Sequence, residues 1–278
     1  MPVIAMTQGM GSLAQDIAEQ LAQELNLSVL QHEVGERVAD KMHVSKSLIN
    51  RLRAGKAGTF ERLRADREGM AIYSAEEVLE AAARGNVVLR GWGATALLRP
   101  VPHVPCVRVM RPLAKRIQWL MAELDTDDAR LAEAEIRRSD ESNASRMHDQ
   151  FGVNWGDPVL FDLVLNTDRL TIDTCVQQIK ALLARPEFAE TPQSLALLKG
   201  MALAAHVRSA LRAHSETHEV HVTIESGDGQ HVTLSGIVLS DKERTLTEKV
   251  AAAVPGVASI DNQLKVMTRT KLFPATKE

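Results

Sequence analysis

The sequence predicts an α/β fold, in which helices cover both faces of a parallel sheet, followed by a small α+β domain. Two observations predict it. Over residues 1–184, short apolar runs alternate with longer segments of helical spacing, and parallel strands need such helical crossovers. After residue 194 the order becomes helix, strand, strand, helix, strand. This second part is too small and too differently ordered to extend the first sheet.

The first domain starts with an apolar run at 2–6, a glycine turn and a helix at 13–25. Large aliphatic residues at every fourth position give that helix one apolar face: Leu13, Ile17, Leu21 and Leu25. The rest of the domain continues the alternation. Strands are predicted at 26–31, 86–93, 103–110 and 161–167, and helical segments at 33–55, 59–85, 111–124, 127–152 and 171–184.

Two serines, each followed by a glutamate three positions later, predict helix starts of the capping-box type. Ser74 and Glu77 predict the start of the helix that ends near Gly85. Ser240 and Glu243 predict the start of a helix in the second domain.

A segment with two prolines and several polar residues, 185–194, separates the two domains. The predicted boundaries are a first domain over 1–186, a linker over 187–193 and a second domain over 194–278. The second domain is expected to contain a helix at 195–214, a hairpin over 218–238 and a final strand at 257–267.

The composition limits the class of protein. The chain has 278 residues, of which 45% are hydrophobic and only 3% aromatic, so its core must consist mainly of aliphatic residues. The net charge of -3 argues against a nucleic-acid partner. No basic segment precedes an apolar run at the start, and no apolar run is long enough for a transmembrane segment. We therefore expect a soluble cytoplasmic protein.

Cysteines and histidines give no clear metal or disulfide pattern. Cys106 and Cys175 form no CxxC pair, which indicates buried thiols in a reducing compartment, with a disulfide between them as the alternative. His214 and His218 have a spacing seen in metal ligands, but no third ligand lies nearby. We expect solvated histidines here and no metal site formed by the protein alone.

The glycine turn after the first strand is a candidate phosphate site. Gly9, Gly11 and Ser12 lie where a strand passes into a helix, and the backbone N–H groups at a helix N-terminus attract phosphate. A complete P-loop also needs a lysine and a serine or threonine. Ala14 and Gln15, or their neighbours, occupy those places, so a plain strand-to-helix turn is an equal alternative.

A second candidate cluster lies within residues 116–158, where arginines gather on predicted helices. They are Arg116, Arg137, Arg138 and Arg146, with Asp140 among them. Phosphoryl transfer needs cations that converge on the phosphates, because its catalysis is mostly positioning and charge neutralisation. The alternative, a pair of solvated charged helices, has more weight on composition alone.

The order of the motifs resembles the cytidylate-kinase-like family, a branch of the P-loop nucleoside monophosphate kinases. The resemblance covers about residues 2–184, and its most specific part is "WGDPVLFDLVLNTDRLTID". It implies ATP as donor with Mg²⁺, a nucleoside monophosphate such as CMP as acceptor, and an arginine-bearing lid. Gly11 and Ser12 match the family's glycine turn. The residues that match the helix before the lid and the lid itself are Arg116, Arg138, Asp140 and Arg146.

The turn departs from the family pattern, since Leu13, Ala14 and Gln15 replace two glycines and an arginine. Loss of that cation removes a charge-assisted contact of about 1.5–3 kcal/mol. Arg90 and Trp92 lie where the family commonly has a Gly-Arg pair. The sequence therefore leaves two functions open. One is an active kinase, and the other is a weak or inactive nucleotide sensor or scaffold that acts through the second domain.

The second domain resembles a BON domain over about 194–267. Its marks are "VTLSGIV", the helix start at "SDKER" and "VPGVASIDNQLKV", all of them structural. The resemblance implies a regulatory or ligand-binding module whose partner is a small ligand, a phospholipid or a protein.

Overall fold

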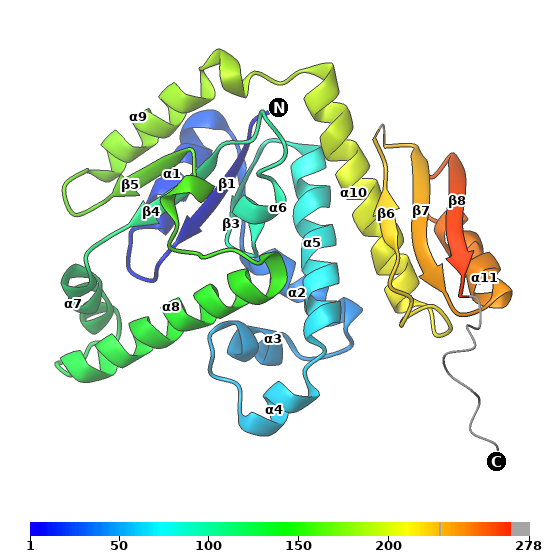
Figure 1. The fold of residues 1–278 in the computed structure, drawn as a ribbon. Coiled ribbons are helices and arrows are strands. Elements are labelled where there is room, and N and C mark those ends of the chain that lie inside the picture. The colour runs from blue at the N-terminus through cyan, green and yellow to red at the C-terminus, as the bar shows by residue number, and fades with distance from the viewer. Residues whose placement is uncertain (228, 268–278) are drawn as a thin grey trace. The chain divides into compact units, whose positions relative to one another are not determined.

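The computed structural model describes residues 1–227 and 229–267 of the chain (Figure 1). The chain divides into two compact units, Met1–Leu195 and Ala196–Glu278. The last residues of the predicted second domain, 268–278, lie outside the described residues. The predicted linker, 187–193, includes the end of η2 (Pro186–Phe188) and the start of α10 (Pro192–Ala213).

The first unit contains the predicted parallel sheet. Five strands lie in the order β2-β3-β1-β4-β5, and every neighbouring pair is parallel. Each strand falls within or overlaps a predicted apolar run. The strands are β1 (Val3–Gln8), β2 (Ser28–Leu30), β3 (Val87–Arg90), β4 (Cys106–Met110) and β5 (Leu163–Asn166).

Helices cover both faces of this sheet, as predicted. On one face, Ile4 and Met6 belong to a core formed with α1 (Ala14–Leu25) and α9 (Ile172–Leu183). Side chains alternate along a strand, so Val3 and Ala5 point the other way. They too are almost fully buried. On that second face α5 (Arg67–Arg84) contacts β3, and α6 (Ala94–Leu97) contacts β1.

Two of the predicted helical segments each contain two helices. The segment 33–55 contains most of α2 (His32–Lys41) and all of α3 (Lys46–Arg53), and 59–85 contains α4 (Thr59–Arg64) and all of α5. New helices start where a polar side chain caps the first turn, as Ser45 does by accepting from the Leu48 backbone N–H. The remaining elements of the unit are α7 (Leu113–Glu123), α8 (Ala129–Phe151) and η1 (Pro158–Leu160).

The capping box predicted at Ser74 is wrong. The helix begins eight residues earlier, where the Asp66 carboxylate accepts from the Gly69 N–H. Ser74 lies inside α5 and donates its hydroxyl to the Met70 carbonyl. Glu77, instead of capping, forms ion pairs with Arg37 and Lys41 of α2, so its side chain joins two helices.

The second unit has the predicted order of elements. After α10 come β6 (Thr223–Glu225), β7 (His231–Val238), α11 (Asp241–Ala252) and β8 (Ser259–Val266). Strand β7 is antiparallel to β6 and parallel to β8. The predicted cap at Ser240 is confirmed, since its hydroxyl accepts from the Glu243 N–H. Across the described residues of both units, no helix has the length and apolar character needed to cross a membrane.

Cys106 and Cys175 are free and buried, so the buried-thiol prediction is confirmed and the disulfide alternative is wrong. Burial, with help from the nearby Asp162 carboxylate, raises the pKa of Cys106 to about 12. This thiol therefore stays protonated and unreactive at neutral pH.

Candidate functional site

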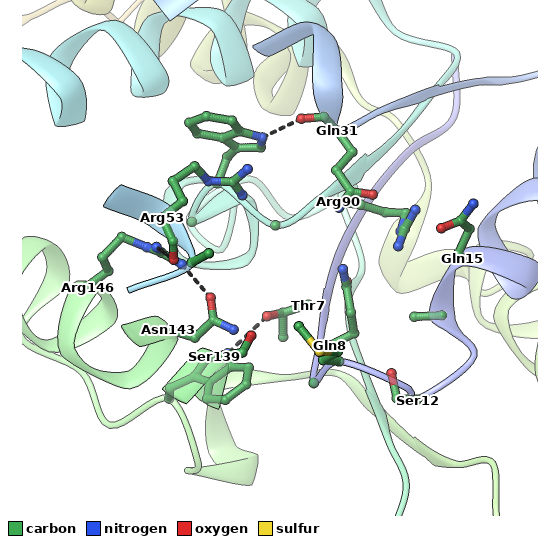
Figure 2. A pocket seen from close by; sticks show the side chains of 18 of the residues that line it. Thr7, Gln8, Ser12, Gln15, Gln31, Arg53, Arg90, Ser139, Asn143 and Arg146 are labelled. Atoms are coloured by element: carbon green, nitrogen blue, oxygen red, sulfur yellow. Dashed lines mark hydrogen bonds between the residues drawn. The ribbon is translucent and has the colours of Figure 1, made fainter. Parts of the chain in front are cut away.

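A pocket of about 360 Å³ lies where the strands β1 and β3 end (Figure 2). Its volume falls within the range of small-ligand sites. The glycine turn after β1, the turn after β3, α3 and α8 all contribute to its walls. This is the carboxyl edge of the parallel sheet, where ligands bind in open α/β folds.

The glycine turn keeps a conformation that suits glycine, although one of its positions is a leucine. Gly11 has a φ of 77°, and Leu13 has a φ of 62° at the N-cap of α1. A left-handed leucine costs about 1–2 kcal/mol. Leu13 was predicted to lie on the apolar face of the helix, but it precedes the first helical residue. No side chain among the described residues caps α1, so its first backbone N–H groups are left for another acceptor.

Helix α7 packs directly against the backbone of the glycine turn. A Cβ atom at Gly9 would lie 2.9 Å from the guanidinium carbon of Arg116, and one at Gly11 would lie 2.9 Å from the Trp119 ring. The Arg116 Nε donates to the Met10 carbonyl at 2.6 Å. Only glycine allows α7 to approach the backbone this closely.

Arg116 and Asp140 form a bidentate ion pair between α7 and α8. The two nitrogen-oxygen distances are 2.8 and 2.7 Å, and Arg116 is buried. The Arg116 guanidinium thus donates one hydrogen bond to Met10 and two to Asp140. Neither partner of the pair lines the pocket. The pair thus links α8 to the glycine turn, behind the cavity.

Arg53 and Arg146 line the other end of the pocket (Figure 2). The Arg53 guanidinium lies 3.5 Å from the centre of the Trp92 ring, a favourable cation–π distance. Arg146 donates to the Arg53 carbonyl at 2.5 Å and to the Asn143 side chain. Among the described residues, no carboxylate forms an ion pair with either arginine.

Both arginines are in an environment that disfavours their charge. Burial, and then the repulsion from Arg146, lowers the pKa of Arg53 to about 9. Burial lowers the pKa of Arg146 to about 10. Two adjacent cations without a carboxylate partner are stabilised by a bound anion, so this end of the pocket is suited to a phosphate.

The segment that contains the "WGDP" motif forms part of the wall. The Trp155 indole N–H donates to the Thr7 hydroxyl of β1 at 3.0 Å. Arg108 of β4 lies 4.4 Å from the centre of the Trp155 ring. Thr167 donates its hydroxyl to the Ser12 carbonyl at 2.9 Å. The motif and the strand after it therefore support the glycine turn.

All three tryptophans of the chain line the pocket: Trp92, Trp119 and Trp155.

The structure brings some predicted site residues together and leaves others outside. Of the predicted site residues, four line the pocket: Gly9, Gly11, Ser12 and Arg146. Arg138 does not line it, and pairs with Glu135 on its own helix at 2.6 Å. Arg53 was not predicted, because an arginine in a charged helix looks solvated. The only sequence signal was its place in the chain, after the second strand and before the third.

A model of the cytidylate kinase-like family matches residues 3–169, more than half of the chain. The chain belongs to the cytidylate kinase-like family. A BON domain model matches residues 201–268. Both resemblances read from the sequence motifs are confirmed. A comparison with curated protein sequences gives no significant match.

A solved structure is similar in fold to about two thirds of this cytidylate kinase-like chain. An uncharacterized protein from Eubacterium ventriosum has 16% identity and a TM-score of 0.53, over 66% of this chain and 100% of its own. Two further matches have lower TM-scores and carry no functional argument. They are shikimate kinase from Bacteroides thetaiotaomicron (14% identity, TM-score 0.43, 66% and 99% coverage) and YorR from Bacillus subtilis in complex with phosphorylated GDP (10%, 0.41, 68% and 99%).

Membership of a kinase-like family implies nucleotide binding, and the turn has features that fit a phosphate donor. The hydroxyl of Ser12 is buried and has no hydrogen-bond partner among the described residues. The uncapped start of α1 opens into the same pocket. A nucleoside triphosphate would supply acceptors for both groups.

The fit to Mg²⁺ is limited to one carboxylate. No cluster of three acidic, histidine or cysteine side chains suited to a metal occurs within the described ranges. Asp16, in the first turn of α1, is the carboxylate that lines the pocket. Nucleotide-bound Mg²⁺ is held by one or two carboxylates and the phosphates, so Asp16 fits as the protein ligand of a metal that arrives with ATP.

Proposed function

We propose that this protein transfers the terminal phosphoryl group of ATP to a nucleoside monophosphate, with CMP as the preferred acceptor. One observation carries the proposal. Over the described residues, a single pocket has an uncapped helix N-terminus at one end and two arginines without carboxylate partners at the other. Such a pocket has a place for two phosphorylated ligands. The family's description supports CMP as the acceptor.

The arginine end would hold the acceptor. Arg146 and Arg53 would donate to the α-phosphate of the monophosphate, which offsets the repulsion between the two guanidinium groups. The stacking of Arg53 on Trp92 fixes the plane of its guanidinium group. The acceptor phosphate would then face the glycine turn.

The turn would hold the donor. The N–H groups of the first turn of α1 and the Ser12 hydroxyl would donate to the phosphates of ATP. Asp16 would hold a Mg²⁺ ion that arrives with ATP, and the metal would neutralise part of the phosphate charge. An oxygen of the acceptor phosphate forms a bond to the γ-phosphorus, and the bond from that phosphorus to the β-phosphate oxygen breaks. ADP leaves with those electrons, and a dianionic acceptor has no proton to lose.

A second candidate function is a nucleotide sensor with little or no turnover. Gln15, which lines the pocket, is neutral where the family has an arginine. That change weakens the hold on the transferring phosphate by about 1.5–3 kcal/mol. Such a protein would bind ATP and signal through its BON domain.

A coupled assay with the full-length chain, ATP, Mg²⁺ and a panel of nucleoside monophosphates separates the two functions. The kinase proposal expects ADP release that depends on the acceptor and is fastest with CMP. Calorimetric binding of ATP without turnover on any acceptor would identify the sensor instead. Absence of both binding and turnover would reject both functions and leave a scaffold.

For the C-terminal unit we propose a regulatory or ligand-binding role. Its support is the BON match alone. Titration of the full-length chain with phospholipid vesicles, while ATP affinity is followed, tests for a lipid ligand. An unchanged ATP affinity and no vesicle binding would remove lipid from the possible partners.

A further inference from the structure

The glycine turn has Gln15 where the family has an arginine, and another charged side chain of the pocket could supply the missing positive charge. Four charged residues line it: Asp16, Arg53, Arg90 and Arg146. Arg53 and Arg146 lie together, away from the turn (Figure 2). Arg90 remains, and the mechanism above gives it no role.

The strand register places Arg90 at the turn. It is the last residue of β3, and it is paired with Met6 of the neighbouring strand β1. The next residue, Gly91, donates its N–H to the Met6 carbonyl at 2.9 Å. Because the strands are parallel, Arg90 and the glycine turn are at the same edge of the sheet.

The side chain of Arg90 extends toward the first turn of α1. Figure 2 shows its guanidinium group beside Gln15, with Ser12 on the same side of the pocket. Asp16 and Glu19, both on α1, attract this guanidinium electrostatically. The Arg90 charge thus lies next to the position from which a cation is missing.

Arg90 is buried and incompletely partnered. Only 7% of its surface is exposed, and its Nε has no hydrogen-bond partner within the described part of the chain. Burial lowers its pKa, although the two α1 carboxylates act in the opposite direction. A buried guanidinium usually has its donors satisfied, so one that lines a pocket and has an unpartnered Nε points to a ligand that supplies an acceptor.

The surrounding groups define the chemistry of that ligand. The uncapped start of α1 and the buried Ser12 hydroxyl offer hydrogen-bond donors, and Arg90 adds a positive charge. An anion with several oxygen acceptors matches all three. The bidentate guanidinium suits a phosphate group in particular.

We propose that Arg90 supplies from β3 the cation that the glycine turn lacks at Gln15, and that it binds the β- and γ-phosphates of the nucleoside triphosphate donor. This inference rests on the proposed kinase or sensor function. It makes the degenerate turn a complete phosphate site, in which the positive charge comes from a neighbouring strand and not from the helix.

The test is calorimetric titration of the full-length chain with ATP and, separately, with CMP. For Arg90→Gln we expect ATP affinity to fall about tenfold or more, while CMP affinity changes less than about twofold. Adenosine serves as a ligand without phosphates, and its affinity should be unchanged. In the double variant Arg90→Gln with Gln15→Arg, the cation returns to the helix, and ATP affinity should recover to near the native value.

The outcomes separate the inference from the proposed function. No ATP binding by the native chain would reject both. Native ATP binding that Arg90→Gln leaves unchanged, or a selective loss of CMP binding, would overturn only the role of Arg90. A fall in adenosine affinity together with a lower melting temperature would show that Arg90 is structural. If Arg90→Gln does not fold, Gln15→Arg in the native background gives the second test. A gain in ATP affinity well above tenfold would show that no cation acts there already.

Discussion

The arginines of α7 and those on the opposite side of the pocket differ in what compensates their charge. Arg116 is buried, and each of its three guanidinium nitrogens donates a hydrogen bond, two of them to Asp140 and one to the Met10 carbonyl. Arg53, Arg90 and Arg146 line the cavity, and no carboxylate forms an ion pair with them among the described residues. We propose that the first kind of arginine stabilises the fold and that the second kind stabilises a bound anion.

This difference matters because the sequence does not distinguish the two kinds. Arg116 and Arg146 were both predicted to contact phosphate. In the structure one lies behind the glycine turn and the other lies in the pocket. The two arginines differ in whether a carboxylate pairs with them, which the residue type does not reveal. Substitutions should therefore reduce stability on one side and ligand affinity on the other.

Removal of Asp140 should have the largest effect on stability. The variant Asp140→Ala leaves Arg116, whose side chain is 10% exposed, without its carboxylate. We expect a loss of about 2–3 kcal/mol in the free energy of unfolding, less than for a fully buried pair because the carboxylate is partly exposed. Urea unfolding measures it. The control is Glu133→Ala, which breaks an exposed pair with Arg137 and should change stability by less than about 0.5 kcal/mol. Equal effects of the two substitutions would contradict the structural role of Asp140.

Removal of Arg146 should affect the ligand more than the fold. Because Arg146 has no carboxylate partner in the part of the chain that the structure describes, and because burial disfavours its charge, Arg146→Ala should leave the melting temperature nearly unchanged. CMP affinity should fall by about 1.5–2 kcal/mol, roughly tenfold or somewhat more. Titration calorimetry measures the CMP affinity of the native and the variant chain, and scanning calorimetry measures their melting temperatures. Arg130→Ala, on the exposed start of the same helix, is the matched control. A drop in stability without a drop in affinity would assign Arg146 to the fold.

His103 is a buried titratable group outside the pocket, and it should affect stability through pH. His103 lies 2.7 Å from the Ser194 hydroxyl and is buried, and burial lowers its pKa. Glu190 acts against that shift and the N-terminus adds to it. The folded chain thus holds fewer protons than the unfolded chain once the pH falls below the usual histidine pKa, so stability should decrease in that range. Thermal unfolding at pH 7 and pH 5 measures the decrease, and His103→Gln should reduce it. An identical decrease in the variant would exclude His103 as its cause.

The smallest effect is expected for Arg138, whose partner is Glu135 on the same helix. Exposed pairs of this kind contribute about 0.5 kcal/mol or less. Arg138→Ala should therefore change both stability and nucleotide affinity only slightly. A tenfold loss of affinity would show instead that Arg138 reaches the nucleotide in the liganded protein, as its match to the family lid implies.

Local pattern predicted most of the fold. The spacing of apolar residues located the strands and the helices, and parallel pairing followed from their alternation. The start of α5 was missed because Asp66 and Ser74 are both good N-cap residues. The burial of Met70 and Tyr73 between them, against Val34 and Val38 of α2, decides for the earlier start. That contact depends on tertiary packing, which a local motif does not include.

The candidate site was predicted only in part. Gly9, Gly11 and Ser12 could be recognised because a glycine turn is a local signal. The grouping of Arg53 with Arg146 could not, since 93 residues separate the two in the hydrogen bond that joins them. Pairing with a carboxylate is also invisible in sequence, so Arg116 and Arg146 received the same interpretation. The roles of the predicted site residues and the cytoplasmic location stay predictions.

The placement of the tryptophans has a consequence for optical spectroscopy. Because Trp92, Trp119 and Trp155 are the only tryptophans of the chain and all line the pocket, all of the tryptophan fluorescence originates around one cavity. Any ligand that enters should change the emission intensity or wavelength without an attached dye. The guanidinium of Arg53 lies against one indole, so phosphate that reorients this arginine would be visible in the same signal. The native chain thus contains its own reporter of occupancy.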